Sequence, residues 1–144
     1  MEDDNDYFKI SCNLTITSEE ISVDEITEKL GISPHRFYRK GEEFCSRHSG
    51  TKGKRVQHLW AISSSDGIYD YENVEPALDE LRYLLKGKED VLLLMKNDAH
   101  YYVSLTIWIE TNYCLIGMDL PDKEIALLNL VNNVHFTFIP NKEL

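Results

Sequence analysis

Two stretches of the chain alternate between apolar and polar residues. In residues 7–17 the apolar positions are Phe8, Ile10, Cys12, Leu14 and Ile16. In residues 101–110 they are Tyr101, Val103, Leu105, Ile107 and Ile109, and the polar-face positions include Tyr102 and Trp108. Because successive side chains of a β-strand point to opposite faces, each stretch predicts a strand with one buried face.

A short helix is predicted soon after the first of these strands. Ser22 and Glu25 have the spacing of a capping box, in which each side chain binds the free backbone N–H of the other residue. The helix is expected over about 23–30 and should end at Gly31, since glycine readily adopts the left-handed conformation that follows a last helical turn. Pro34 then prevents the helix from resuming.

The remainder of the chain predicts further helices and a last strand. Residues 73–86 carry an apolar stripe made of Val74, Ala77, Leu78, Leu81, Leu84 and Leu85, and the other face of this helix is acidic. Residues 88–97, KEDVLLLMKN, contain an apolar run that suits either a short helix or a buried strand, and we favour a helix. A helix is expected over about 121–132, with Ile125, Leu128 and Val131 on its apolar face, and residues 135–139 should form a closing strand.

The middle of the chain predicts a hairpin with a positively charged tip. Residues 42–47 and 55–63 are expected to pair through the connection SRHSGTKGKR, whose glycines suit a turn. The second arm, RVQHLWAIS, contains Trp60.

The composition fits one globular domain of the α+β class. The chain has 144 residues, of which 42% are hydrophobic, and this is enough for a single domain with its own core. We expect an antiparallel sheet with helices packed on one face, preceded by a flexible acidic tail over residues 1–6. Residues 7–16 and 100–109 are similar in plan, and each leads into a short helix. This likeness predicts a ferredoxin-like arrangement with an internal pseudo-repeat.

The order of the predicted elements and turns has a parallel in a known family. The first strand is followed by ITEKLGISPHRFYRKGE, in which Leu30, Gly31 and Pro34 precede Gly41, and then by a strand near Trp60 and an acidic, leucine-rich helix. This order resembles a bacterial family called domain of unknown function 4279. The segment GMDLPDKEIALLNLVNNVHFTF fits the family's ending of strand, helix and strand, although family members often end with more glycine and aspartate. The resemblance implies a fold and a bacterial source, and it supplies no catalytic residues.

Charge and cysteine content bear on the location of the protein. The formal net charge is −10. No segment approaches the roughly 18 apolar residues of a membrane span, and the opening MEDDND is unlike a secretory signal. The cysteines, Cys12, Cys45 and Cys114, are odd in number and widely spaced. We therefore expect a cytoplasmic protein with reduced thiols and no membrane association.

No familiar catalytic, cofactor-binding or metal-binding motif is present. Cys45 and His48 form a Cys-x-x-His, but the second ligand pair of a tetrahedral zinc site is missing. None of the five histidines accompanies a nucleophile motif. We therefore expect no catalytic residue, no metal and no cofactor. A site assembled in space from His48, His58 and the arginines stays as the enzymatic alternative.

The positive charge of this acidic chain is concentrated in one segment. Residues 34–58 contain seven cationic side chains and two carboxylates, a net +5, so the remainder carries −15. The cationic residues are Arg36, Arg39, Lys40, Arg47, Lys52, Lys54 and Arg55. Separated fields of this kind steer charged partners. Alternatively, the lysines only keep an exposed hairpin soluble.

The acidic remainder suggests a basic protein partner. The candidate contacts are four carboxylates of the helix over 73–86 and two aromatic anchors: Glu72, Glu75, Asp79, Glu80, Tyr102 and Trp108. Small acidic bacterial proteins of such families often resemble immunity proteins. By this analogy we expect a non-enzymatic binding protein that neutralises a cognate toxin, nuclease-like and basic, by occluding it.

A nucleic-acid or anionic-ligand module acting through the basic segment is the alternative function. Tyr7, Tyr102 and Trp108 on an open sheet face could stack on bases. A sequence pI of about 4.9, the lack of both RNA-recognition signatures and the position of Glu110 near Trp108 argue against nucleic acid. The sequence leaves the oligomeric state open.

Overall fold

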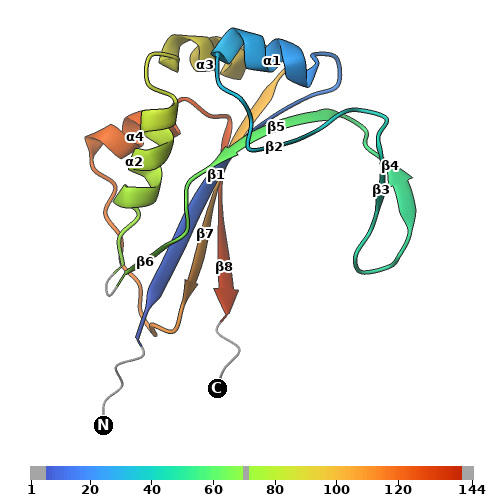
Figure 1. Ribbon diagram of the computed structural model, residues 1–144. Coiled ribbons are helices and arrows are strands. Elements are labelled where there is room, and N and C mark those ends of the chain that lie inside the picture. The colour runs from blue at the N-terminus through green and yellow to red at the C-terminus, as the bar shows by residue number, and fades with distance from the viewer. Residues whose placement is uncertain (1–5, 70–71, 141–144) are drawn as a thin grey trace.

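In the part of the chain that the structure describes, four helices lie on one face of a β-sheet, which confirms the predicted α+β class (Figure 1). The computed structural model describes residues 6–69 and 72–140, so residues 1–5 of the expected tail lie outside the described residues. The helices are α1 (Val23–Leu30), α2 (Glu75–Leu84), α3 (Glu89–Lys96) and α4 (Asp122–Leu128). The strands are β1 (Phe8–Ser18), β2 (Arg36–Tyr38), β3 (Glu43–Cys45), β4 (Lys52–Lys54), β5 (His58–Ser63), β6 (Gly67–Tyr69), β7 (Tyr102–Thr111) and β8 (Asn133–Pro140).

The main sheet has the strand order β2-β5-β1-β7-β8, and β6 also pairs with β1. The two amphipathic strands form its centre, where Ile10 lies opposite Ile109 and Leu14 opposite Leu105. Among the described strands, β7 and β8 are the parallel pair, and α4 lies in the crossover that such a connection requires. The sheet is therefore mixed rather than fully antiparallel as predicted.

The core lies between this sheet and the helices, where the alternation predicts it. The even-numbered residues of β1 and residues 103, 105, 107 and 109 of β7 are buried, while their neighbours on the outer face are partly or fully exposed. Ile26 and Leu30 of α1 and Leu78 and Leu81 of α2 pack onto that face. Trp60 of β5 is completely buried beside them.

The start and the end of α1 follow the predicted signals, although only the Ser22 half of the capping box forms and the Glu25 carboxylate contacts Lys29 instead. Ser22 Oγ accepts the backbone N–H of Glu25 at 3.1 Å, and the helix ends at Gly31, which has a φ of 68°. The apolar run that suited a helix or a strand forms α3, with Leu92 and Met95 buried. Among the described residues, none of the helices is long and apolar enough to cross a membrane.

The predicted hairpin is paired differently in the structure. β3 and β4 pair with each other in a separate two-stranded sheet, whereas His58–Ser63 joins the main sheet between β1 and β2. The reason is burial, because Trp60 and Ile62 are buried under the helices while β3 and β4 are mostly exposed. Residues 39–55, called the basic arm below, project from the body of the domain (Figure 1).

The two halves of the expected pseudo-repeat differ in topology. β1 and α1 are followed by β2 and β5, which form an antiparallel part of the sheet, whereas β7 and α4 are followed by the parallel strand β8. The pseudo-repeat and the ferredoxin-like arrangement are therefore not confirmed.

Candidate functional site

A groove of about 630 Å³ lies between α2 and α4. Its floor is apolar and includes Leu85, Leu127 and Leu130. Its rim is charged, with Asp79 and Glu89 facing a set of cations made of Arg82, Lys86 and Lys123. An apolar floor inside a polar rim is the usual composition of a site that binds another molecule.

The sequence of α2 explains how one helix serves both the core and the groove. Leu78 and Leu81 face the sheet and are fully buried. Asp79 and Arg82 follow them by one residue, a rotation of roughly 100° around the helix, and so reach the side of α2 that faces α4. The polar wall of the groove is therefore held by the apolar stripe that anchors the helix.

Charged side chains connect the first turns of α2 and α4. Lys123 Nζ lies 3.0 Å from Asp79 Oδ2, 3.3 Å from Glu75 Oε1 and 3.8 Å from Glu124 Oε2. Arg82 Nη1 lies 3.1 Å from Asp79 Oδ1. The two cations thus compensate Glu75, Asp79 and Glu124. These three carboxylates, together with Glu72 just before α2 and Asp122 at the start of α4, are called the acidic end of the groove below.

Glu124 is the unusual member of this group. Its side chain is 0% exposed, and in the ionised form neither carboxylate oxygen receives a hydrogen bond. Burial, followed by the proximity of Asp79, raises the pKa of Glu124 to about 7. A proton on Glu124 would let this carboxyl donate to Asp79, so the two groups are best described as a pair that shares one proton below about pH 7.

The neighbours of Glu124 are held in their charged forms. Burial opposes the ionisation of Asp79, but hydrogen bonds with Glu124, Lys123 and Arg82 together hold the pKa of Asp79 below its ordinary value. Hydrogen bonds to Asp79 and then to Glu75 raise the pKa of Lys123. The acidic end therefore contains fixed charges around one carboxyl that titrates near neutrality.

Three carboxylates of the acidic end are close enough to share a cation. One oxygen from each of Glu75, Asp79 and Glu124 lies within 4.8 Å of the others. The Lys123 ammonium already contacts all three side chains, at 3.0–3.8 Å. This lysine supplies the positive charge that a metal ion would otherwise provide.

The structure brings together two of the four acidic residues predicted to bind a partner. Glu75 and Asp79 meet at the acidic end, and Glu72 precedes α2 there. Glu80 instead accepts hydrogen bonds from the backbone N–H and the hydroxyl of Ser65, at 2.9 and 3.2 Å. Glu80 therefore fixes a connection between strands and does not face the groove.

The two predicted aromatic anchors lie on the opposite side of the sheet. Tyr102 and Trp108 are on the outer face of β7, which carries no helix (Figure 1). Trp108 lines a hollow of about 280 Å³ with Lys9, Asp66 and Glu110. One flat partner surface therefore cannot contact both these aromatic residues and the acidic residues of α2, and the role of Tyr102 and Trp108 stays a prediction.

The basic arm keeps most of its cationic side chains at the surface. Arg39 pairs with Asp24 at 3.2 Å, and the Arg55 guanidinium lies over the rings of Tyr38 and Phe44 at 4.0 and 4.3 Å. Lys40 donates to the backbone oxygen of Glu19. Four predicted anion-binding residues form no ion pair within the described part of the chain: Arg36, Arg47, Lys52 and Lys54. The arm is therefore an open cationic surface.

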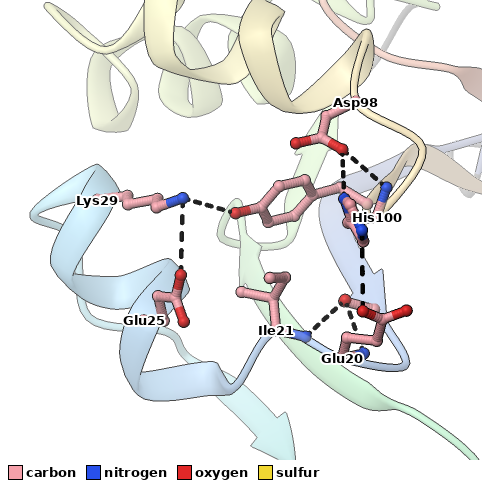
Figure 2. Close-up of polar contacts among 8 residues, drawn as sticks. Glu20, Ile21, Glu25, Lys29, Asp98 and His100 are labelled. Carbon is pink, nitrogen blue, oxygen red and sulfur yellow. Dashed lines mark hydrogen bonds and ion pairs between the residues drawn. The ribbon is translucent and has the colours of Figure 1, made fainter.

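A second polar cluster surrounds His100, which the sequence did not single out (Figure 2). His100 Nδ1 lies 2.8 Å from Asp98 Oδ1, and its Nε2 lies 3.8 Å from Glu20 Oε2. The hydrogen bond with Asp98, followed by the charges of Asp98 and Glu20, raises the pKa of His100. The adjacent Lys29 donates to the Tyr101 hydroxyl at 3.0 Å. The charged groups lie near the surface, whereas Tyr101 is buried, and the contacts tie α1 to the start of β7.

The other histidines with a described role support the backbone. His35 Nδ1 accepts the N–H of Ser63 at 2.9 Å, and His58 Nδ1 accepts the N–H of Lys40 at 3.1 Å. In both rings Nδ1 is therefore occupied by a structural hydrogen bond.

Residue spacing alone did not predict the roles of Arg82, Lys123 and Glu124. The predicted apolar face of α4 contained Ile125 and Leu128, but Ile125 is 46% exposed while Glu124 and Leu127 are buried. The buried face is thus rotated by one residue from the predicted one. The available signal was that Glu124, Leu127 and Val131 also have helical spacing. Because Glu124 is polar, this spacing does not by itself predict a buried face.

Comparison with known proteins identifies the family of the chain. A family model described as "Domain of unknown function (DUF4279)" matches residues 8–138. Searches of curated proteins and of solved structures gave no match. Since the family match spans nearly all the described elements, this protein belongs to the DUF4279 family.

Proposed function

We propose that this protein is a non-enzymatic, cytoplasmic binding protein that neutralises a basic protein partner by covering its functional surface. The partner proposed is a toxin encoded by the adjacent gene, so that the protein acts as an immunity protein. The observation that carries the proposal is the groove between α2 and α4, which combines an apolar floor with a concentration of carboxylates at one end.

The chemistry of the groove fits a partner segment that carries both apolar and cationic side chains. Leu85, Leu127 and Leu130 offer apolar contact. Glu72 and Asp122 are not engaged by Arg82 or Lys123, so they are available to an arginine or lysine of the partner. Binding energy in protein interfaces tends to come from such a buried apolar centre, and charges at the rim add specificity and speed of association.

The net charge supports the same kind of partner. The chain carries −15 outside residues 34–58. Proteins that cleave nucleic acids hold their substrate in a positive cleft, and an acidic inhibitor is attracted to that cleft over long range. Occlusion needs no catalytic residue in the inhibitor.

Co-purification and toxicity assays test the proposal. The purified full chain is mixed with the product of the adjacent gene, and affinity is measured by titration calorimetry. Glu72→Lys with Asp122→Lys should weaken binding by at least tenfold, because two attractive charges become repulsive. The matched control is Glu19→Lys with Glu28→Lys, which changes the net charge equally at exposed positions near and on α1. Absence of a complex, together with unrelieved toxicity on co-expression, would contradict the proposal.

An anion-binding module acting through the basic arm is the second candidate. The specific observation in its favour is the open surface formed by Arg47, Lys52 and Lys54, which have no ion pair in the described chain. This candidate requires affinity for a single-stranded oligonucleotide that falls steeply with added salt. Lys52→Glu with Lys54→Glu should then abolish that affinity. No binding at low ionic strength would remove this candidate.

A further inference from the structure

β8 is an unprotected edge of the main sheet. It is the last strand in the order β2-β5-β1-β7-β8, and no described residue outside β7 forms a backbone hydrogen bond with it. An edge strand presents unpaired N–H and C=O groups that can pair with another strand. Proteins normally protect such edges with charges, with bulges or by keeping the strand short.

The opposite edge of the same sheet shows that protection. β2 is only three residues long, begins with Arg36 and leads directly into the basic arm. β8 has eight residues, NVHFTFIP, and contains no lysine, arginine, aspartate or glutamate. Only one of the two edges is therefore open to pairing.

The open edge also exposes large apolar side chains. Phe136 and Phe138 lie in register with Ile107 and Ile109, on the helix-facing side of the sheet. They are nevertheless 41% and 56% exposed, and their rings stack with centroids 6.5 Å apart. Figure 1 shows the reason, since the end of β8 extends beyond all four helices.

We propose that two copies of this chain pair antiparallel through β8, around a two-fold axis at Phe136. In this register Phe136 faces Phe136 of the second copy, and Val134 faces Phe138 of the second copy. The four phenylalanines then form one apolar strip along a sheet that runs through both copies. Cross-strand aromatic pairs of this kind stabilise adjacent strands.

Charge favours a second copy as the occupant of this edge. Two bodies of net charge −10 repel each other wherever their carboxylates meet. The uncharged strand is a place where two backbones can approach without bringing like charges together. Repulsion from the rest of the surface is screened beyond about 8 Å at physiological salt. Added salt should therefore strengthen the dimer, which is the opposite of its effect on a charge-driven complex.

The inference does not depend on the proposed function, because the groove between α2 and α4 takes no part in the pairing. One strand pair buries less than the roughly 1,200 Å² at the lower limit of standard interfaces. The dimer is thus expected to depend on protein concentration.

Sedimentation velocity of the full chain, over a range of protein concentrations and at low and high salt, tests the inference. The expected result is a rise from monomer to dimer that Phe138→Lys abolishes, because each introduced lysine would replace a phenylalanine of the apolar strip and would face the apolar Val134 of the second copy. The matched control is Leu94→Lys, which places the same charge on an apolar residue of α3 that is 73% exposed. A chain that stays monomeric throughout, or equal losses in the two variants, would overturn the proposal.

Cross-linking provides a second test that does not depend on how well Phe138→Lys folds. The chain with Cys45→Ser and Cys114→Ser keeps only the buried Cys12. Directly opposite residues place their Cβ atoms about 4.5–5.5 Å apart, near the range that a disulfide bridges. Phe136→Cys in this background should give a covalent dimer on mild oxidation, and Leu94→Cys should not. Equal cross-linking of the two variants, or none from Phe136→Cys, would overturn the proposed register.

Discussion

The acidic end of the groove and the basic arm carry opposite charge and are built in opposite ways. At the acidic end the charges are linked to one another and to the core, with Glu124 fully buried and Lys123 shared among three carboxylates. In the basic arm Lys52 and Lys54 lie on a small separate sheet, and Arg55 is held mainly by two aromatic rings. Mutations at the acidic end should therefore change the stability of the whole fold, whereas mutations in the basic arm should affect only the arm.

The largest loss of stability is expected from truncating a buried side chain that holds α2, and with it the acidic end, against the sheet. Leu81→Ala deletes a fully buried side chain of α2, and such truncations cost about 2–5 kcal/mol. The free energy of unfolding of the whole domain, measured by urea denaturation, should fall by that amount. Phe44→Ala in the basic arm is the contrasting variant, and its global unfolding midpoint should stay close to that of the wild type. Equal destabilisation by the two variants would show that the arm belongs to the cooperative unit.

A smaller change in stability, of opposite sign, is expected when Glu124 is replaced by glutamine. Because its pKa is raised to about 7 in the folded state, the stabilisation that comes from protonated Glu124 is complete below its ordinary pKa and is lost as the pH rises through about 7. Glu124→Gln mimics the protonated form. The variant should therefore be more stable than the wild type at pH 8, by about 1–3 kcal/mol, and the difference should narrow at pH 5.

Thermal unfolding across this pH range measures the effect of Glu124→Gln. Asp122→Asn is the matched control, since it removes a carboxylate from an exposed position of the same helix. A variant that is less stable than the wild type at pH 8 would mean that the ionised carboxylate of Glu124 stabilises the fold.

In the basic arm a local effect is expected from loss of the Arg55 guanidinium. Arg55→Ala removes contacts over Tyr38 and Phe44, each of a kind worth about 0.5–1 kcal/mol at exposed sites. Hydrogen exchange should quicken in residues 43–54 and should stay unchanged in α2. Faster exchange in both regions would contradict the separation of the arm from the body.

The smallest change in stability is expected when the exposed cluster around His100 is altered. The pKa of this histidine is raised in the folded state, so its contribution to stability is present below its ordinary pKa near 6.5 and is lost as the pH rises through the folded-state value. His100→Gln should lower the Tm slightly at pH 5.5 and leave it unchanged at pH 8.5. The titration of the His100 ring followed by NMR provides a direct check, and a pKa below that of a free histidine would contradict the structure in Figure 2.

The fold was predictable where one face of an element is apolar. The alternation of β1 and β7 and the capping signals of α1 gave those elements nearly to the residue. The hairpin prediction was wrong because pairing between strands depends on which of them the helices cover, and local patterns do not contain that information. The direction of β8 was also not predictable, since it depends on the crossover through α4.

The candidate site was predictable only in part. Glu72, Glu75 and Asp79 were found from the acidic face of α2, but their partners on α4 are more than 40 residues away in sequence, as the bond from Lys123 to Asp79 shows. Separation of Tyr102 and Trp108 from these residues follows from which sheet face each occupies. Residue type and spacing indicate charge and burial, whereas the meeting of α2 with α4 is a property of the folded chain.

Affinity for the product of the adjacent gene, measured in parallel for two charge-reversed variants, tests the central claim most directly. The two variants are Glu72→Lys with Asp122→Lys at the acidic end, and Lys52→Glu with Lys54→Glu in the basic arm. If the groove binds the partner, the variant at the acidic end should lose binding and protection against toxicity, while the variant in the basic arm should keep both. Loss of binding in the arm variant, with wild-type affinity in the groove variant, would contradict this claim.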